Sequence, residues 1–177
     1  MYAKRLRTYR RTGFQLIADG ILSKQAANAI FDSENYIDVF EQDVVEAEKR
    51  IIVSSPALSQ DKVKRFIYLV KDRQETGCQV TVITTDPQNI FYGSPEFYQE
   101  LIQEMQQSGI RVITKEDAAE RFAVMDDELV WHGGMNLLGK ADAWDNLMRI
   151  KSAQVAAELL EMALKKDLNE EDSDEET

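Results

Sequence analysis

Short β-branched runs alternate with amphipathic helical segments through the middle of this chain, and this alternation constrains the fold more than any other feature. The runs at 51–55, 79–84 and 110–113 have the composition of buried strands. Between them, segments 59–77 and 94–109 repeat apolar residues at helical spacing, and each begins with a serine and ends with a glycine. The order strand, helix, strand, helix, strand predicts right-handed crossovers and a parallel sheet.

The second half of the chain follows a different pattern. Apolar runs at 122–125 and 129–132 flank an acidic turn, which indicates a β-hairpin. A further strand is expected at 146–150, and a helix from about Gln154 to Lys166. Near the N-terminus, Ile21 to Phe31 is rich in Ala, Ile and Leu and indicates an additional helix. The expected fold class is therefore α/β, with a mixed, largely parallel sheet flanked by helices.

The two ends of the chain carry opposite charge. Met1 to Thr12 contains five bases and no acid, and Asp167 to Thr177 contains seven acids and no base, in a chain of formal net charge -11. The acidic run has one apolar residue, so it is predicted to be a disordered, solubilising tail. The alternative is a decoy that competes with phosphates for a basic surface on the same protein or on a partner. The expected division is an arm and helix at 1–36, an α/β domain at 37–166, and the tail at 167–177.

The basic N-terminal arm interleaves two tyrosines with its cations, a composition that suits phosphate contacts and base stacking. The alternative is a solvated arm that pairs with acidic parts of the protein. DNA is therefore a candidate partner, although the net charge of -11 argues against a generally basic binding surface. The cations of the arm are Lys4, Arg5, Arg7, Arg10 and Arg11.

A single cysteine, Cys78, and a single histidine, His132, limit the chemistry of one chain. They exclude zinc sites, Ser-His-Asp triads, Cys-His pairs and two-histidine metal centres, so we expect no cofactor and no metal. We expect Cys78 to be inert packing and His132 to be a structural residue. No apolar run approaches the roughly 20 residues of a membrane span, which predicts a cytoplasmic protein with no membrane partner.

Three segments of the second half carry a specific motif: Ala119–Asp126, Trp131–Leu138 and Asp145–Ile150. Together they resemble the phospholipase D superfamily, whose motif is HxKxxxxD followed after six residues by GSxN. The resemblance covers roughly Ile37 to Leu164 and is closest to the single-motif domains attached to bacterial helicases. It implies a homodimer of half-sites, a nucleic-acid-processing context and a helicase-type protein as a candidate partner.

The resemblance also implies a phosphohistidine mechanism, in which the motif histidine attacks phosphorus while lysine and asparagine hold the non-bridging oxygens. This sequence departs from the motif, because Ala119 stands at the histidine position, Arg121 at the lysine position and Gly134 at the serine position. Alanine carries no nucleophile, which predicts a catalytically inactive domain that acts as a binding or assembly module. The motif positions that are retained, with their spacing, are Asp126, Gly133 and Asn136.

The retained positions predict an anion pocket. Arg121 is expected to bind phosphate bidentately, with a hydrogen bond from Asn136 and a close approach to the backbone at Gly133. Asp145 lies where relatives carry an acid that orients the histidine. The alternative is an ion pair from Arg121 to Asp126 or Asp145 that fills the vacated pocket, with the polar side chains holding turns and strand ends.

Two further hypotheses stay open on the sequence. The first is that the protein is an active phosphodiesterase or nuclease, which uses Asp145 as a substitute nucleophile or a metal held by Asp126, Asp127 and Glu128. The second is that the protein is a purely structural oligomerisation unit.

Overall fold

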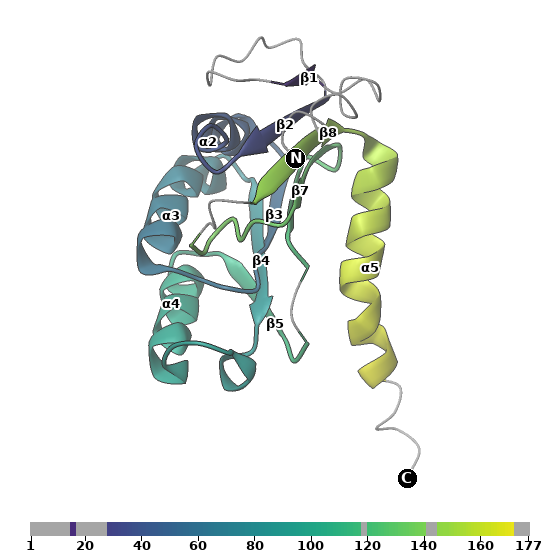
Figure 1. Ribbon diagram of the computed structural model, residues 1–177. Helices are drawn as coiled ribbons and strands as arrows, with labels where there is room; N and C mark the ends of the chain where they lie inside the picture. The colour runs from purple at the N-terminus through teal and green to yellow at the C-terminus, as the bar shows by residue number, and fades with distance from the viewer. Residues whose placement is uncertain (1–14, 17–27, 118–119, 141–144, 172–177) are drawn as a thin grey trace.

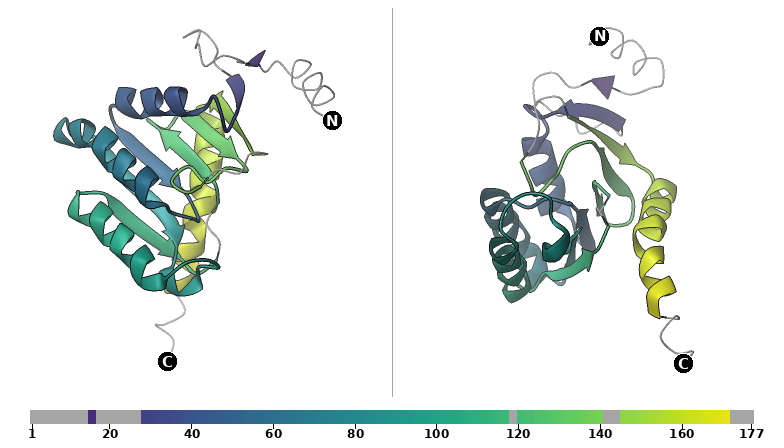
Figure 2. Two further views of the ribbon diagram at one scale, coloured as in Figure 1. Left: turned by 60° about the vertical axis from the view of Figure 1, so that its left-hand side comes forward. Right: turned by 60° about the horizontal axis from the view of Figure 1, so that its bottom comes forward.

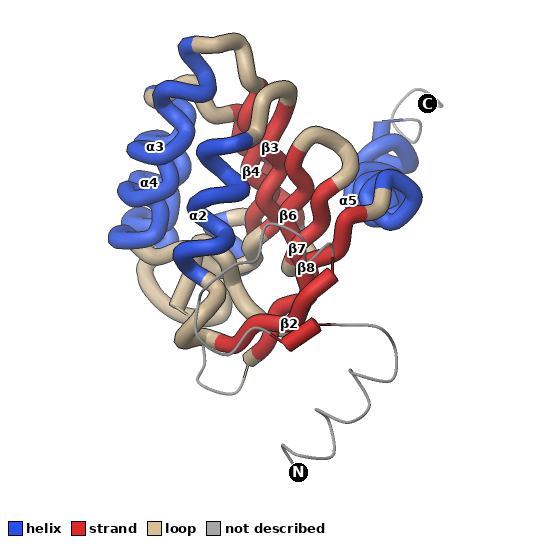
Figure 3. The backbone as a smooth tube through the Cα atoms, turned by 90° about the horizontal axis from the view of Figure 1, so that it is seen from above, coloured by secondary structure: helices blue, strands red, loops and turns tan. Residues whose placement is uncertain are grey.

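A mixed sheet runs through the molecule, with helices on both of its faces (Figure 1). The structure is a computed structural model that describes residues 15–16, 28–117, 120–140 and 145–171. The described strands follow the order β1-β2-β8-β7-β6-β3-β4-β5. Helices α2, α3 and α4 lie on one face, and α5 (Ala153–Glu171) lies on the other, as the turned views also show (Figures 2 and 3).

A parallel unit forms one side of the sheet, as the alternating sequence pattern predicts. β3 (Arg50–Ser54), β4 (Gln79–Thr85) and β5 (Arg111–Lys115) pair in parallel. α3 (Gln60–Glu75) connects the first two strands, and α4 (Pro95–Gln107) connects β4 to β5 after the short 3-10 helix η1 at residues 87–89. α2, at residues 37–46, precedes this unit.

The other side of the sheet is antiparallel. β6 (Phe122–Met125) pairs with β3, and β7 (Leu129–Gly133) folds back on β6 as the predicted hairpin. β8 (Asn146–Lys151) pairs with β7, and β2 (Asn28–Asp32) pairs with β8. The α/β class with a mixed sheet is confirmed. Parallel pairing in the described strands is limited to β3-β4-β5 and the short β1 (Gln15–Leu16) beside β2, less than expected.

The predicted start of each connecting helix lies where the sequence indicates, but the two starts differ in their hydrogen bonds. The Ser94 hydroxyl accepts the N–H of Phe97 and caps α4, with Pro95 as the first helical residue. Ser59 precedes α3 without a side-chain cap, and its N–H donates instead to Leu138 O at 2.8 Å. The start of α3 is therefore tied to a loop from the other half of the chain.

A buried ion pair fastens α2 to the antiparallel strands. Asp43, 6% exposed, accepts hydrogen bonds from Trp131 Nε1 at 2.7 Å and from Arg149 Nε and Nη2 at 2.7 and 2.9 Å. Phe31 and Phe40 pack on the Trp131 ring with centroid separations of 5.0 and 5.6 Å. This polar cluster lies inside the larger core, between the sheet and helices α2, α3 and α4.

A smaller core lies under α5, on the other face of the sheet. Strand alternation supplies it, since successive residues of β3 and β6 point to opposite faces. Its buried residues are Ile52, Ile83, Phe122, Val124, Val130, Ala156, Leu159, Leu160 and Ala163.

Two predictions at the ends of the chain are wrong. Of the helix expected from Ile21 to Phe31, residues 21–27 lie outside the described residues. The rest is wrong, because Asn28–Asp32 is a strand, in which pairing with β8 and packing of Phe31 on Trp131 outweigh local helix propensity. Residues 28–32 therefore belong to the sheet of the domain. The final helix continues to Glu171, into the predicted tail, because an existing helix propagates readily through Glu-rich sequence.

Candidate functional site

The strand register brings the motif segments together at the carboxyl ends of the parallel strands, and this end of the sheet is called the site edge below. Ser54, at the end of β3, lies opposite Phe122, at the start of β6. Phe122 in turn lies opposite His132, and Gly133 lies opposite Leu147. The segments just beyond these residues, which carry most of the predicted site residues, therefore meet at this edge.

Arg121 lies at this edge without a carboxylate partner. Its Nη1 donates to Gly134 O at 3.0 Å, and the side chain is exposed. No ion pair to Asp126 or Asp145 forms among the described residues, so the predicted alternative of a vacated pocket filled by such a pair is wrong. Asp126 lies at the other end of β6, which explains why it cannot reach Arg121. The guanidinium therefore keeps N–H donors for a ligand.

The two adjacent glycines have different surroundings. A Cβ added to Gly133 would lie 2.1 Å from Asn146 O, so this glycine is required by the close approach of β8. A Cβ on Gly134 would lie 3.0 Å from Asp145 Oδ1. Within the described residues no hydrogen bond engages the Asp145 carboxylate, which lies beside Gly134.

Asn136 belongs to a loop that is fixed against the loop after β3. Its Oδ1 accepts the N–H of Ala57 at 3.3 Å. Leu138 N donates to Ser55 Oγ at 3.2 Å, and the Ser55 hydroxyl donates to Ala57 O at 2.8 Å. Asn136 therefore has the positioning role that the alternative predicts, while its amide nitrogen makes no hydrogen bond within the described part of the chain.

Asp126 is a structural residue at the opposite edge of the sheet. Its carboxylate accepts the backbone N–H groups of Glu48, Lys49 and Arg50, at 2.7 Å for the shortest bond. Burial raises the pKa of Asp126, but these hydrogen bonds outweigh burial and hold the pKa below its ordinary value. A φ of 52° places the residue in the left-handed region, which Asp tolerates better than most residues.

The proposed metal site at the acidic turn is wrong. Asp127 forms an ion pair with Arg50, and Glu128 forms one with Lys151 at 3.3 Å, so each carboxylate of the turn has its own partner. Asp126 is occupied by backbone N–H groups. In the described ranges, no group of three or more His, Cys, Asp or Glu side chains is placed to hold a metal ion.

Several predicted residues lie outside the described residues. These are Ala119 and the arm cations Lys4, Arg5, Arg7, Arg10 and Arg11. His132 is described, and it is a half-buried residue of β7 opposite Met148 and Phe122.

Sequence reasoning missed a tyrosine that supports the site edge. Tyr98, on the first turn of α4, donates to Pro56 O at 2.8 Å, and its hydroxyl lies 2.6 Å from Thr84 Oγ1. Burial raises the pKa of Tyr98 to about 12, so the phenol stays protonated and able to donate. The signal in the sequence is only its place on the apolar face of the helix, which predicts burial but no partner.

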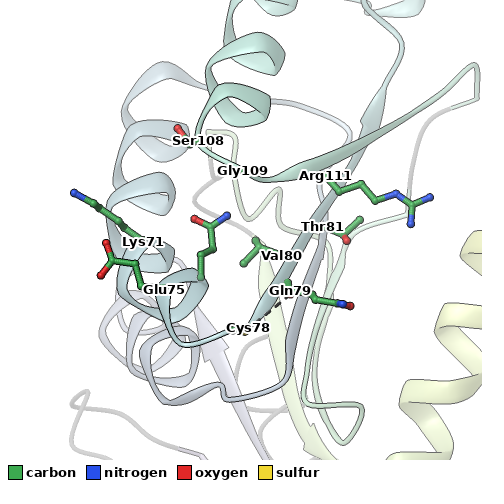
Figure 4. Close-up of a pocket in the computed structure, with 10 residues that line it drawn as sticks. Lys71, Glu75, Cys78, Gln79, Val80, Thr81, Ser108, Gly109 and Arg111 are labelled. Atoms are coloured by element: carbon green, nitrogen blue, oxygen red, sulfur yellow. Dashed lines mark hydrogen bonds between the residues drawn. The ribbon is translucent and has the colours of Figure 1, made fainter.

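A hollow of about 690 Å³ opens at the opposite edge of the sheet, away from Arg121 (Figure 4). It lies between the ends of α3 and α4 and the starts of β4 and β5, with Lys71, Glu75 and Arg111 around it. Cys78 lies there at 4% exposure, and burial raises the pKa of its thiol. The low reactivity of a buried, protonated thiol matches a packing role.

None of the described helices is long and apolar enough to cross a membrane. This finding concerns the described residues alone.

Comparison with known structures places the fold. Nuc, a phospholipase D family member from Salmonella typhimurium, is 15% identical with a TM-score of 0.60, over 78% of this chain and 91% of that chain. NucT from Helicobacter pylori is 13% identical with a TM-score of 0.59, over 78% and 93%. TrmBL2, described as an archaeal chromatin protein with a novel mode of DNA binding, is 15% identical with a TM-score of 0.55, over 95% and 59%.

The family comparison extends this likeness to the sequence. Nothing among the curated proteins matches the chain. A family model described as "Cardiolipin synthase, PLD-like domain" matches residues 41–166. Since this match spans well over half of the chain, the protein belongs to the phospholipase D-like family.

Proposed function

We propose that this protein is a catalytically inactive phospholipase D-like domain that binds phosphate groups, in a nucleic-acid-processing context, as a binding or assembly module. The observation that carries the proposal is Ala119 at the position of the family nucleophile, in a chain that otherwise keeps the motif spacing. An alanine side chain cannot attack phosphorus. His132, the one histidine of the sequence, belongs to β7 rather than to the motif segment before β6.

Phosphate binding is supported by Arg121 and its surroundings. The guanidinium is exposed and held by a single hydrogen bond to Gly134 O within the described residues. A planar guanidinium with free N–H groups suits a phosphate with two acceptor oxygens. Asn136 adds an amide nitrogen with no hydrogen bond in the described part of the chain, on the same edge. Gly133 contributes by letting β8 approach and so fixing this loop.

The nucleic-acid context has two supports. The first is the N-terminal arm, with its five cations and two tyrosines. The second is the likeness to TrmBL2, an archaeal chromatin protein that is described as binding DNA. A helicase-type protein partner follows from the resemblance to helicase-attached domains.

The same domain is proposed to form a homodimer. The chain carries one copy of the motif, and two half-sites related by a two-fold axis make one complete site in single-motif relatives.

The rival function is an active phosphodiesterase. One observation favours it: the Asp145 carboxylate lies beside Gly134 without a hydrogen-bond partner in the described part of the chain. A carboxylate is a weak nucleophile toward a phosphodiester, and hydrolysis through it would also require a proton donor for the leaving group.

Titration of a fluorescently labelled single-stranded oligonucleotide tests the binding proposal. Arg121→Gln should weaken binding about five- to tenfold. It should also reduce the slope of log affinity against log salt concentration by the amount that one phosphate contact contributes. Arg65→Gln is the matched control, because Arg65 is an exposed arginine of α3 that pairs with Glu41. Removal of Met1 to Thr12 should abolish binding. Equal affinity of the wild type and Arg121→Gln would refute a phosphate site at Arg121.

A further inference from the structure

An exposed aromatic loop at residues 90–97 has no role in the proposed function. Phe91 is 88% exposed and Tyr92 is 93% exposed, and Phe97, one turn into α4, is 45% exposed. Large aromatic side chains grouped on a surface are typical of interaction sites, since isolated solvent exposure of rings this large costs hydration free energy. The loop follows β4, so it belongs to the same edge of the sheet as Arg121.

The aromatic loop is held at both ends. Before it, the Asp86 carboxylate accepts the N–H of Gln88 at 2.8 Å and caps η1. Within its second half, the Ser94 hydroxyl accepts the N–H of Phe97 at 3.3 Å and caps α4. Tyr98 anchors the same turn to Pro56 O. The exposed rings therefore project from a fixed frame, which lowers the entropy lost on binding.

Carboxylates surround the aromatic loop. Asp86 precedes η1, and Glu96 and Glu100 lie on α4. The N–H of Asp86 donates to Lys115 O at 2.8 Å, which brings the end of β5 alongside. Hydrogen bonds from the Ser94 hydroxyl and the backbone lower the pKa of Glu96, so this side chain is charged at neutral pH. Glu116 and Asp117 follow directly. This charge repels nucleic acid and anionic lipid and attracts a basic segment.

The chain itself contains a segment of complementary composition. Met1 to Thr12 has five cations and no acid, together with Tyr2, Leu6 and Tyr9. Arginine pairs with carboxylates and also stacks on aromatic rings, so both properties of the aromatic loop match this segment.

Sheet order decides which copy supplies the arm. β1 and β5 are the two edge strands, and β1 and α4 lie at opposite ends of the molecule (Figure 1). Seven strand spacings correspond to roughly 34 Å. Fully extended, the 14 residues before β1 reach up to about 50 Å, but the part from Tyr9 to β1 reaches only about 21 Å. Contact of Tyr9 with the aromatic loop therefore requires another molecule.

We propose that the aromatic loop at residues 90–97 binds the basic segment Met1–Thr12 of a second copy of this chain. The contact joins two different surfaces of the chain, so it occurs twice when two copies exchange their arms in a two-fold dimer, and once per copy in a head-to-tail array. It is separate from the phosphate site at Arg121, but it uses the arm that the proposed function assigns to nucleic acid, so the aromatic loop and an oligonucleotide compete for the arm.

The test is photo-cross-linking between isotopically distinct full-length copies. Unlabelled protein with p-benzoylphenylalanine in place of Tyr9 is mixed with ¹⁵N-labelled protein, irradiated, digested and analysed by mass spectrometry. We expect unlabelled arm peptides joined to ¹⁵N peptides that contain residues 90–97. The double variant Phe91→Ala, Tyr92→Ala in the labelled copy should reduce this product at least tenfold. Tyr68→Ala is the matched control, because Tyr68 is a 72% exposed aromatic residue on α3, and it should leave the product unchanged.

Three outcomes overturn the proposal. Cross-links to residues 90–97 that occur only within unlabelled molecules show docking within one copy. Cross-links that are insensitive to the double variant show that the arm docks elsewhere. Loss of vesicle or oligonucleotide binding by the double variant, without a change in cross-linking, assigns the aromatic loop to a lipid or nucleic-acid partner.

Discussion

Two neighbouring glycines at the end of β7 lack a side chain for different physical reasons. Gly133 lies against backbone, since an added Cβ would meet Asn146 O at 2.1 Å, and a strand cannot move away without losing its ladder. Gly134 lies against the Asp145 carboxylate, a side chain that can rotate. Of the two, only Gly133 is fixed by the fold.

The pair gives a matched stability test. Gly133→Ala should lower the free energy of unfolding by about 3 kcal/mol, because the methyl group forces β7 and β8 apart. Gly134→Ala should change it by less than about 1 kcal/mol, with a gain of chain stiffness offsetting the crowding. Urea unfolding measures both variants, and equal effects would contradict the strand-contact explanation of Gly133.

Asp126 predicts a pH dependence of stability. Its pKa is lowered in the folded state, so the stabilisation is present above the unfolded carboxyl pKa of about 3.9 and is lost as the pH falls through the folded value. Asp126→Asn should cost about 1–2 kcal/mol at pH 7, and the difference from the wild type should shrink below pH 4.

Urea unfolding at pH 7 and pH 3 measures this dependence. Asp127→Asn is the control, because the ion pair of Asp127 with Arg50 is exposed and contributes less than about 1 kcal/mol. A difference between wild type and Asp126→Asn that grows in acid would exclude the backbone hydrogen bonds as its source.

At the scale of elements, the Asp43 cluster is what ties α2 to β7 and β8. The carboxylate is buried and accepts hydrogen bonds from both Trp131 and Arg149. Removing one partner of such a cluster leaves the other charge buried. We therefore expect the contact between α2 and the antiparallel strands to depend on this single side chain.

Asp43→Ala should lower the free energy of unfolding by about 3–5 kcal/mol. The matched control is Glu41→Gln on the same helix, because Glu41 pairs with Arg65 at the surface and should cost less than about 1 kcal/mol. Denaturant unfolding of both variants provides the measurement, and similar small losses would show that packing alone holds α2.

Sequence pattern predicts elements where local and tertiary forces agree. The β3-α3-β4-α4-β5 unit and the hairpin at Asp126 follow from apolar spacing and turn residues. The segment ending at Phe31 does not, because its strand exists only through pairing with β8, more than a hundred residues later. The end of α5 was missed for a different reason, since charge content alone cannot distinguish a charged helix from a charged coil.

The candidate site shows the same division. Motif spacing predicts that Arg121, Gly133 and Asn136 meet, and the register of β6, β7 and β8 brings their segments to one edge. The side-chain distances that decide whether Arg121 is open to a ligand or paired with a carboxylate of the protein could not be predicted. Whether Arg121 pairs with Asp145 or with Gly134 O depends on loop geometry that a spacing rule does not contain.

For the whole molecule, the proposal is that a phospholipase D-like fold binds phosphate without a nucleophile, since the resemblance aligns Ala119 with the motif histidine. Holding a phosphate requires Arg121 and a fixed backbone, whereas hydrolysis also requires an attacking group and a proton donor. A domain of this fold that lacks an attacking group can therefore still hold a phosphate.

Hydrolysis of bis(4-nitrophenyl) phosphate by the purified wild-type protein tests this claim most directly, with Mg²⁺, with Mn²⁺ and with a chelator. We predict release of nitrophenol at the rate of buffer alone under all three conditions, and the same rate for Asp145→Asn. Turnover by the wild type that Asp145→Asn abolishes would contradict the claim, because it would identify a working nucleophile at this edge of the sheet.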